Sequence, residues 1–377
     1  MSERLNIALI GAGHLGGSFA LALREAGADV AITAYDLDAA QAELLQLRGA
    51  VDAIAASVEQ AVRNADLVML ATPLRTYPAL AQAMAPDLPA HAVVTDLGSV
   101  KRSMEALAAW LPAGRLVPGH PIAGGEQTGA AVARGDLFRG KLCILTPDES
   151  VNVQAIESVE TLWHLTGADV LRMPTPVHDT VYAHVSHVPH VVAFVAAEFF
   201  YRLGVRVDAA DDTLQRFLRI SRSDARMWSD IVLENREAVL SALSTYGAVL
   251  EHFARELRSN PSHGEGDEAH LAPQFLPRIL ASSLISSVSL YEQQSGMQLR
   301  PFGAGGMRDI VAPAAIDPET EFEKISHHAA VIALLLEKVI PLFRHVEQLI
   351  GAEDEDALFA EFSAMTEHAR SLISARQ

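Results

Sequence analysis

The first half of the chain alternates short apolar runs with stretches of helical periodicity. The apolar runs have the length of strands buried on both faces of a sheet, and they lie at residues 5–10, 30–35, 67–71, 92–95, 116–117 and 142–145. The helical stretches lie at residues 18–26, 39–47 and 100–110. Strands that alternate with helices predict an α/β fold with a doubly wound parallel sheet and right-handed crossovers.

The pattern changes after about residue 175, where strand patterns almost vanish. Apolar residues at three- and four-residue spacing predict long helices over 181–203, 225–258 and 321–349. Pro341 is expected to kink or break the last of them. The polar run at 259–270, rich in glycine and acid, predicts a loop. We therefore expect an α/β domain over residues 1–175 and an all-helical domain over residues 176–377.

The helical half contains one internal echo. Residues 188–193 read VPHVVA and residues 276–281 read LPRILA, with proline second in both. A duplicated helical unit would explain the likeness, and chance would explain it as well, since only six positions are involved.

Composition narrows the class of protein. Half of the 377 residues are hydrophobic and 20% are charged, which is the balance of a globular chain of two or three domains. The formal net charge of −18 repels phosphate backbones and anionic lipid, so neither nucleic acid nor a membrane is expected as a partner. Cys143 is the one cysteine, which excludes an intrachain disulfide and fits a reducing compartment. The first residues carry no secretory pattern, and the apolar stretches are shorter than the roughly 20 residues that span a bilayer. We expect a cytoplasmic location.

A glycine-rich loop joins the first predicted strand to the first helix. Gly11, Gly13 and Gly16 have the spacing that allows a tight turn, close approach of a pyrophosphate and packing of the helix on the sheet. Asp36 ends the next strand, where a carboxylate binds the ribose hydroxyls of NAD and repels the 2′-phosphate of NADP. The loop also contains His14 and Leu15, which we assign to the cofactor site with it. The alternative is a plain glycine turn with a solvated Asp36.

Three further motifs follow strand ends, where ligands of open α/β sheets gather. Thr72 and Pro73 follow the third strand, and they are either cofactor contacts or a strand terminator. Ser99 follows the fourth strand and either binds ligand or caps the next helix, while Lys101 is expected to be a solvated first-turn residue. His120 stands in a Gly- and Pro-rich turn, where its ordinary pKa near neutrality suits removal of a proton.

The helical half offers histidines and arginines. The histidines are clustered at one-turn spacing but lack a nearby cysteine or paired carboxylates, so no metal is expected; they are His178, His184, His187 and His190. Arginine forks suit bidentate binding of carboxylates, although Arg219, Arg222 and Arg226 could equally form a solvated face paired with Asp224 or Asp230. Trp228 is expected in the core on general grounds.

Several separated motifs together resemble the prephenate/arogenate dehydrogenase family. They are Gly119-His-Pro-Ile-Ala-Gly, the upstream Asp96-x-Gly-Ser-Val-Lys, Val185-Ser-His-x-Pro-His, and Arg219-Ile-x-x-Ser-Asp-x-x-Met-Trp228. The resemblance covers roughly residues 5–255. It implies a Rossmann-type domain followed by a helical domain that forms a homodimer. It also implies NAD as cofactor and oxidative decarboxylation of prephenate to 4-hydroxyphenylpyruvate on the way to tyrosine, or of arogenate to tyrosine directly.

The resemblance also implies roles for individual residues. His120 matches the histidine that accepts the proton of the ring hydroxyl, and Ser99 matches a serine that orients it. Arg219 matches the arginine that grips a substrate carboxylate. The other matched positions line the active-site region; they are Glu126, Ser186, His187, His190 and Trp228.

The chain departs from the family pattern in two places. The Gly-Gly-Phe-Arg/Lys-Asp run that usually precedes the matched arginine is replaced by LQRFL at residues 214–218, and a similar run, GAGGMRD, stands at 303–309. Arg308 in that run either replaces a missing basic contact or belongs to a duplicated unit. The C-terminal third shows no βαββαβ pattern, so inhibition by tyrosine through a regulatory domain is not expected.

Rival interpretations remain at this stage. A Rossmann-plus-helical hydroxy-acid dehydrogenase would explain the fold and Asp36, but not His120 in its motif. An NAD-binding regulator without chemistry would need neither His120 nor Ser99 with Arg219. An amino-substituted prephenate as substrate would have less need of a base directed at a hydroxyl.

Overall fold

The computed structural model describes residues 4–125, 127–205, 212–259, 266–303, 305–312 and 318–374. Contacts within the chain divide it into two compact units, Met1–Asp179 and Thr180–Gln377. The boundary expected between residues 175 and 176 lies close to this division. The fold class predicted from the sequence is confirmed: a parallel sheet with helices comes first, and a helical unit follows.

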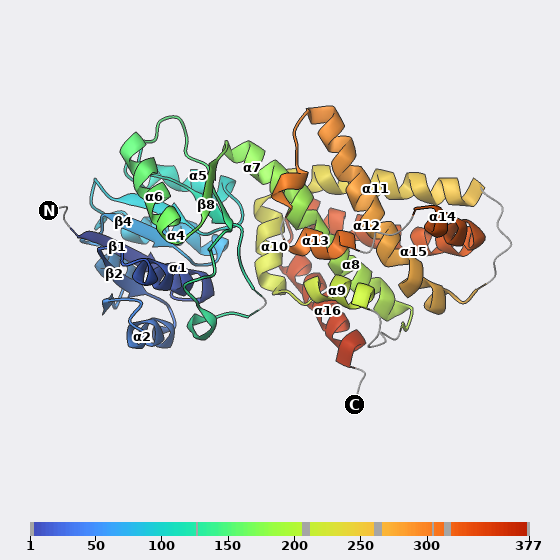
Figure 1. Cartoon of the computed structure of the whole chain (residues 1–377), viewed down its shortest axis with the longest axis horizontal. Helices are drawn as coiled ribbons and strands as arrows, with labels where there is room; N and C mark the ends of the chain where they lie inside the picture. The colour runs from blue at the N-terminus through green and yellow to red at the C-terminus, as the bar shows by residue number, and fades with distance from the viewer. Residues whose placement is uncertain are drawn as a thin grey trace. The chain divides into compact units, whose positions relative to one another are not determined.

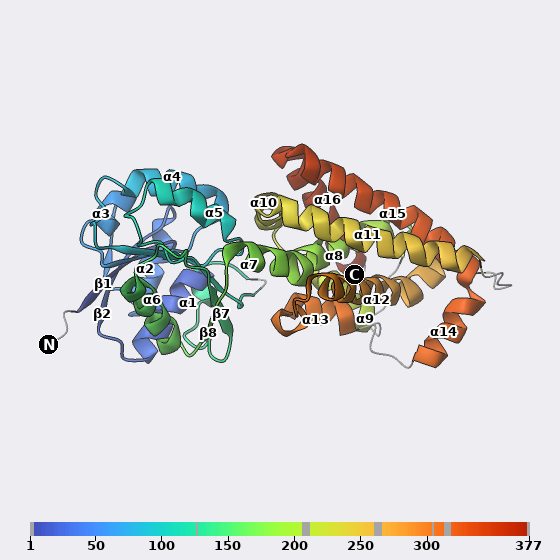
Figure 2. The same cartoon turned by 90° about the horizontal axis from the view of Figure 1, so that it is seen from above.

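The first unit is built on a five-stranded parallel sheet in the order β3-β2-β1-β4-β5. Its strands are β1 (Leu5–Ile10), β2 (Val30–Tyr35), β3 (Ala53–Ile54), β4 (Leu67–Leu70) and β5 (Val93–Asp96). Its helices are α1 (His14–Glu25), α2 (Ala39–Leu47), α3 (Val58–Val62), α4 (Tyr77–Met84), α5 (Arg102–Glu105) and α6 (Val153–Leu165). Helices α1, α2 and α6 cover one face of the sheet and α3, α4 and α5 the other (Figures 1 and 2).

A second, three-stranded sheet extends this unit. Its strands are β6 (Gly119–Pro121), β7 (Leu142–Leu145) and β8 (Asp169–Arg172), with β6 antiparallel and β8 parallel to β7. The strand expected at residues 116–117 is wrong, because Leu116 makes only an isolated bridge to Val94. His120 is therefore not in a turn but inside β6, where the backbone ladder to β7 fixes its direction. Strands β3 and β8 were not expected, since one has two residues and the other has mostly exposed side chains.

The second unit is helical throughout its described residues. After α7 (Thr175–Tyr182) and one π-helical turn, Ala183–His187, come α8 (Val188–Arg202), α9 (Asp212–Ile220), α10 (Ala225–Glu234), α11 (Arg236–Ser259), α12 (Glu268–Ser295), α13 (Gly305–Val311), α14 (Pro318–His327), α15 (Ala329–Ala352) and α16 (Glu355–Ser374). The expected loop at 259–270 is shorter than predicted, because α12 already begins at Glu268. No described helix is both long and apolar enough to cross a membrane.

The predicted long helices are real but divided. The helix expected over 225–258 breaks at Asn235, and the one expected over 321–349 breaks at His328, each with a non-helical backbone. In contrast, α15 continues through Pro341. A proline removes one backbone hydrogen bond, and the buried neighbours Val339 and Phe343 hold the helix against the core on either side of it.

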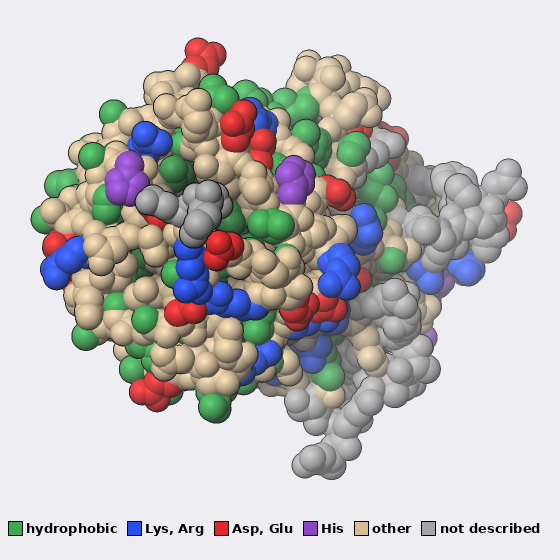
Figure 3. Space-filling view, turned by 60° about the vertical axis from the view of Figure 1, so that its left-hand side comes forward, with side chains coloured by type: hydrophobic (Ala, Val, Ile, Leu, Met, Phe, Trp, Pro, Cys, Tyr) green, Lys and Arg blue, Asp and Glu red, His purple; other side chains and the backbone are tan. Residues whose placement is uncertain are grey.

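The net negative charge of the chain is not gathered on one patch of the face drawn in Figure 3. Acidic and basic side chains alternate there with hydrophobic and uncharged polar ones. Beneath this surface the first unit has a continuous apolar core in which the rings of Phe19 and Phe138 pack against Trp163, with centroids 5.3 and 5.2 Å apart. This core holds the sheet whose carboxyl edge carries the candidate site.

Candidate active site

The glycine loop after β1 has the shape that a dinucleotide needs. Gly11 has φ 102°, and a Cβ there would lie 2.5 Å from the carbonyl oxygen of Ala71. A Cβ at Gly16 would lie 2.2 Å from the carbonyl oxygen of Gly11, so neither position admits a side chain. A Cβ at Gly13 would meet nothing within 4 Å, and no side chain caps α1 there. The N-terminus of α1 therefore presents its N–H groups and its positive dipole end to an anion.

The other predicted cofactor residues surround this loop. Asp36 follows β2 and accepts hydrogen bonds from the backbone N–H groups of Ala12 (2.6 Å) and Asp38 (2.9 Å). A carboxylate has about four acceptor positions, so capacity remains for ribose hydroxyls. Leu15 packs against the apolar core, and a Cβ at Gly125 would lie 3.3 Å from the His14 ring. Thr72 and Pro73 lie just past the end of β4 at Leu70, and the Thr72 hydroxyl bonds that of Thr76 at 2.8 Å. These residues fit NAD.

We expect Asp36→Asn to raise the KM for NAD by about tenfold and to narrow the preference over NADP, because a charged acceptor is replaced by a neutral one. The measurement is the KM for each cofactor with the same protein preparation. Asp38→Asn is the matched control, since this exposed side chain caps α2 and asparagine also caps. Equal KM values for Asp36→Asn and the parent would contradict the assignment.

A chain of three side chains ends at His120. Asp179 Oδ1 lies 2.7 Å from His178 Nδ1, and His178 Nε2 lies 2.8 Å from His120 Nδ1. A carboxylate only accepts hydrogen bonds, so His178 donates from Nδ1 and keeps its lone pair on Nε2. That lone pair accepts from His120 Nδ1, which leaves His120 Nε2 unprotonated. This is the tautomer that a base requires.

A buried ion pair anchors the residue before His120. The side chains of Lys101 and Asp96 are both fully buried, with Nζ 2.6 and 2.7 Å from the two carboxylate oxygens. Lys101 Nζ also donates to the carbonyl oxygen of Gly119, and Asp96 accepts from the Gly119 N–H at 2.9 Å. Tyr77 and the Gly98 N–H complete the donors around Asp96. Both backbone groups of Gly119 are thus held by one ion pair.

Burial sets the charge states in this network. It lowers the pKa of His178, more than Asp179 raises it, so His178 is neutral. Burial alone would raise the pKa of Asp179, but hydrogen bonds from His178 and from the N–H groups of Lys101 and Arg102 lower it overall. Burial also lowers the pKa of Lys101, and the Asp96 carboxylate opposes this effect. The chain that reaches His120 therefore begins with a carboxylate and passes through a neutral ring.

The structure corrects two expectations at this edge. Lys101 is not a solvated first-turn residue, because Asp96 holds its side chain in the interior. Ser99 does not cap α5: this helix begins at Arg102, and the Asp179 carboxylate accepts from the N–H groups of Lys101 and Arg102, each at 2.9 Å. Ser99 is half-buried in the turn after β5. Glu126 lies outside the described residues.

In the helical unit four of the predicted residues come together. Trp228 stacks on His190, with ring centroids 3.5 Å apart, and meets the edge of His187 at 6.2 Å. His190 Nδ1 bonds the Ser186 carbonyl oxygen at 2.8 Å, and Asn235 Nδ2 lies 3.1 Å from His187 Nδ1. Trp228 is buried, as general grounds suggested, and is in contact with two of the matched histidines. The π-helical turn that carries Ser186 and His187 is a feature frequent at functional sites.

Two of the three predicted arginines pair with carboxylates that the sequence did not indicate. Arg219, in α9, forms an ion pair with Asp309 of α13. Arg226 pairs with Glu355 at 3.0 Å and lies 3.6 Å above the Phe359 ring. Asp224, one of the expected partners, instead caps α10 through the Met227 N–H.

We expect the helical unit to lose stability between pH 6.5 and 4. Burial lowers the pKa of His184 and of His190 to about 4, so the unfolded chain binds these protons in that window and the folded chain does not. Each histidine then costs up to about 1.4 kcal/mol per pH unit as the pH falls. The measurement is the free energy of unfolding in urea at pH 7 and 5. His190→Gln should flatten the dependence, whereas His252→Gln, an exposed control, should not. An equally steep dependence in both variants would exclude the buried ring as its source.

Comparisons with known proteins agree with this geometry. Residues 19–172 match the sequence model for the prephenate dehydrogenase nucleotide-binding domain, and residues 174–271 match that for the prephenate dehydrogenase dimerization domain. The chain is 34% identical over 259 residues to the cyclohexadienyl dehydrogenase of Zymomonas mobilis, covering 67% of this chain and 86% of that one. It belongs to the prephenate dehydrogenase family. It is also 32% identical over 243 residues to the prephenate dehydrogenase of Bacillus subtilis, covering 62% of this chain and 65% of that one.

A solved structure of the family supports the fold. The prephenate dehydrogenase of Aquifex aeolicus in complex with hydroxyphenyl propionate and NAD⁺ superimposes with a TM-score of 0.60 at 30% identity, covering 77% of this chain and 98% of that one. The first unit is thus the family's NAD-binding domain. The part of this chain after residue 271 lies beyond the matched dimerization domain.

Sequence reasoning named His178 among the clustered histidines and Asp96 within a family motif, but it linked neither to His120, and it did not single out Asp179. The family motifs point to His120 directly, but His178 lies 58 positions further on, and nothing in the intervening pattern predicts that α7 returns to β6. His178-Asp179 was a visible pair of a base and an acid in a mostly apolar helix start. That pair, next to a predicted domain boundary, was the one sequence signal that could have indicated a role for His178 and Asp179 in the site.

Proposed function

We propose that this chain oxidatively decarboxylates prephenate to 4-hydroxyphenylpyruvate, with NAD as hydride acceptor. The observation that carries the proposal is the Asp179–His178–His120 chain, which leaves an unprotonated nitrogen on a histidine in the same unit as the dinucleotide loop. A histidine base fits the hydroxyl of a cyclohexadienol. The name of the Aquifex complex, which pairs NAD⁺ with a hydroxyphenyl acid, supports the same substrate class.

The chain's own residues have separable tasks in this reaction. His120 Nε2 accepts the hydroxyl proton as the carbonyl character of that carbon develops. His178 keeps the ring of His120 in the required tautomer, and Asp179 stabilises the positive charge that His120 acquires. NAD, held by the glycine loop and Asp36, would supply the hydride acceptor, and loss of carbon dioxide from the opposite ring carbon completes the aromatic ring. Because aromatisation drives the reaction, positioning of the ring is the main demand on the protein.

The remaining assigned residues belong to the same proposal. Ser99 orients the hydroxyl and His120, and Arg219 binds the side-chain carboxylate of the substrate. The further residues proposed to line the active-site region are Ser186, His187, His190, Trp228 and Glu126. The clustering of the four helical residues around Trp228 supports their grouping.

The first experiment is NADH formation by the purified full chain with NAD, with prephenate and arogenate offered separately. Turnover of prephenate with a higher kcat/KM than arogenate supports the proposal, and the reverse ratio makes the chain an arogenate dehydrogenase. Turnover of neither substrate, with NAD binding intact, overturns it and favours the hydroxy-acid dehydrogenase interpretation.

We expect Asp179→Asn to lower kcat by about 10²-fold and to move the acidic limb of the kcat profile to lower pH, because the carboxylate that stabilises the charge acquired by His120 is lost. An amide can donate to His178 Nδ1, which reverses the tautomer of both rings and protonates His120 Nε2. The measurement is kcat against pH for the parent and the variant. Asp169→Asn, in exposed β8, is the matched control. A plateau equal to the parent's would exclude a positioning role for Asp179.

Two predictions from the sequence stay predictions. A cytoplasmic location is one of them, and assembly into a homodimer is the other. The match of residues 174–271 to a dimerization domain supports pairing through this kind of helical domain.

A further inference from the structure

The helical unit repeats itself with a constant offset. Helices α9, α10 and α11 begin at residues 212, 225 and 236, and α13, α14 and α15 begin at residues 305, 318 and 329, each 93 positions later. Helices α10 and α11 end at residues 234 and 259, and α14 and α15 end at residues 327 and 352, again 93 positions later. The preceding helices α8 and α12 end at residues 202 and 295, again 93 positions apart, whereas the echoed segments VPHVVA and LPRILA within them lie 88 positions apart.

The junction between the last two helices of each set repeats as well. Asn235 separates α10 from α11 with φ −104° and ψ 28°, and His328 separates α14 from α15 with φ −106° and ψ 18°. These two residues are also 93 positions apart. A similar non-helical backbone at equivalent places is a detail of the chain path that two unrelated helical hairpins have no reason to share.

Burial follows the same offset. The buried residues of α11 include Val239, Ala242, Leu243, Tyr246, Leu250 and Leu257, and their equivalents in α15 are the buried residues Ile332, Leu335, Leu336, Val339, Phe343 and Ile350. Only two of the 24 aligned positions, at Leu243 and His252, keep the same residue in α15. The alignment of α11 with α15 rests only on where the helices begin. The match between their buried positions is therefore separate support for the repeat.

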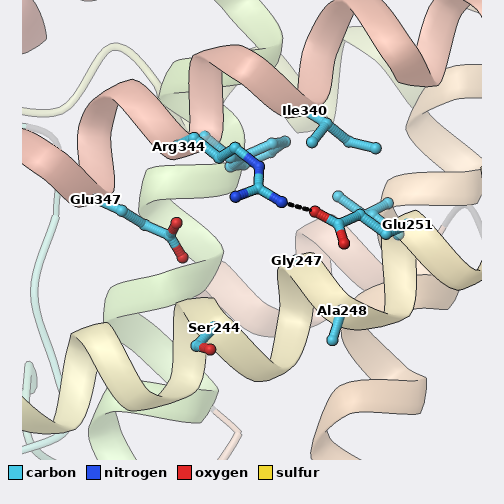
Figure 4. A pocket seen from close by; sticks show the side chains of 9 residues that line it. Ser244, Gly247, Ala248, Glu251, Ile340, Arg344 and Glu347 are labelled. Atoms are coloured by element: carbon cyan, nitrogen blue, oxygen red, sulfur yellow. Dashed lines mark hydrogen bonds and ion pairs between the residues drawn. The ribbon is translucent and has the colours of Figure 1, made fainter.

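The two sets pack on each other through equivalent positions. Helices α11 and α15 lie along one another (Figure 2), and Glu251 forms an ion pair with Arg344, its equivalent 93 positions later. Figure 4 shows this pair facing across the groove between the two helices, with Gly247 and Ile340, also equivalent, beside it. Contact between equivalent positions is the mark of an interface with two-fold symmetry.

We propose that α12–α15 is a diverged second copy of α8–α11, fused in the same chain, and that it occupies the place of a second chain's dimerization domain. The protein is then a monomer with an internal pseudo-dimer. The sequence match to the dimerization domain ends at residue 271, after the first copy and at the start of α12. The GAGGMRD run at 303–309 belongs to the second copy, where Asp309 pairs with Arg219 of the first.

The charges on α11 favour a fused copy over a second chain. In a homodimer built through this face, Glu251 would meet Glu251 of the other chain, and like charges in direct contact destabilise an interface. In the fused arrangement the two positions have diverged to Glu251 and Arg344, which attract. After a duplication the two helices of the interface can change separately, so the sequence of α11 no longer has to be complementary to itself.

The first test is the molar mass of the full chain by light scattering after size exclusion, over a hundredfold range of concentration. The proposal expects the mass of one chain, 40.5 kDa, throughout. Twice this mass at all concentrations, or a rise toward it, overturns the monomer. The readout needs no activity, so it is independent of the proposed reaction.

The second test locates the partner of α11 by oxidative cross-linking. Cys143 is fully buried and does not compete. The double variant Glu251→Cys/Arg344→Cys is expected to form a bridge within one chain, seen as a cross-linked peptide from a band of single-chain mass. Glu251→Cys alone is the matched control, and it should remain a single chain. A covalent two-chain product from the control would overturn the proposal and indicate a homodimer through α11. A two-chain product from the double variant alone would also overturn it, and would indicate that two chains exchange helices.

Discussion

His120→Asn is expected to lower kcat by about 10²- to 10⁴-fold while the affinity for NAD stays unchanged, which is the range that general base catalysis contributes. The asparagine amide can still donate to His178 Nε2 in place of His120 Nδ1, so the Asp179–His178 pair keeps its partner. What disappears is the nitrogen that accepts the hydroxyl proton. The loss therefore falls on the chemical step.

The measurement combines steady-state NADH formation with NAD binding by calorimetry. His164→Asn is the matched control, because this histidine is exposed on α6 of the same unit and should leave kcat unchanged. If His120→Asn turned over at the parental rate, the base would have to be another group, and the interpretation of the Asp179–His178–His120 chain would be wrong. If NAD binding fell as far as kcat, the variant would be reporting a disturbed cofactor loop.

Local patterns predicted much of the fold. The strands β1, β2 and β7 were predicted with their observed bounds, because each is a mainly apolar run of strand length. The order of the five parallel strands was not predicted, because right-handed crossovers set the hand of each connection and not which strands are neighbours. The division of the long helices at Asn235 and His328 was not predicted, since a single non-helical residue does not interrupt the apolar spacing on either side.

In the candidate site, too, some residues were predicted correctly from the sequence and others were not. Gly11, Gly16 and Asp36 were found because their constraints are local: a turn, a close approach and a strand end. Lys101 was misjudged because its environment depends on Asp96 and on the β5–β6 contact, neither of which its neighbours in sequence reveal. The link between His178 and His120 was missed for the same reason, since the two partners of His178 come from its own helix and from a strand 58 positions earlier. Hydrogen bonds between residues far apart in the chain leave no periodic pattern in the sequence, so such contacts could not be predicted from it.

The same network ties the stability of the first unit to the position of its base. Lys101 and Asp96 hold both backbone groups of Gly119, and Asp179, which ends the chain to His120, caps α5 beside Lys101. A change in the ion pair therefore reaches His120 by two routes, through the strand that carries it and through the helix start beside Asp179. Stability and kcat should decline together when this pair is broken.

Lys101→Met is accordingly expected to lower the free energy of unfolding of the first unit by about 3–5 kcal/mol, because it leaves the Asp96 carboxylate buried without its cation. The measurement is urea unfolding followed by near-ultraviolet circular dichroism, to which the buried Trp163 of this unit and the buried Trp228 of the helical unit both contribute. Lys141→Met is the matched control at an exposed position, with an expected change within about 0.5 kcal/mol. The double variant Lys101→Met/Asp96→Asn should recover part of the loss, since it removes the uncompensated charge as well. If it were less stable than Lys101→Met alone, the cost would lie in the hydrogen bonds to Gly119 and not in the unpaired carboxylate.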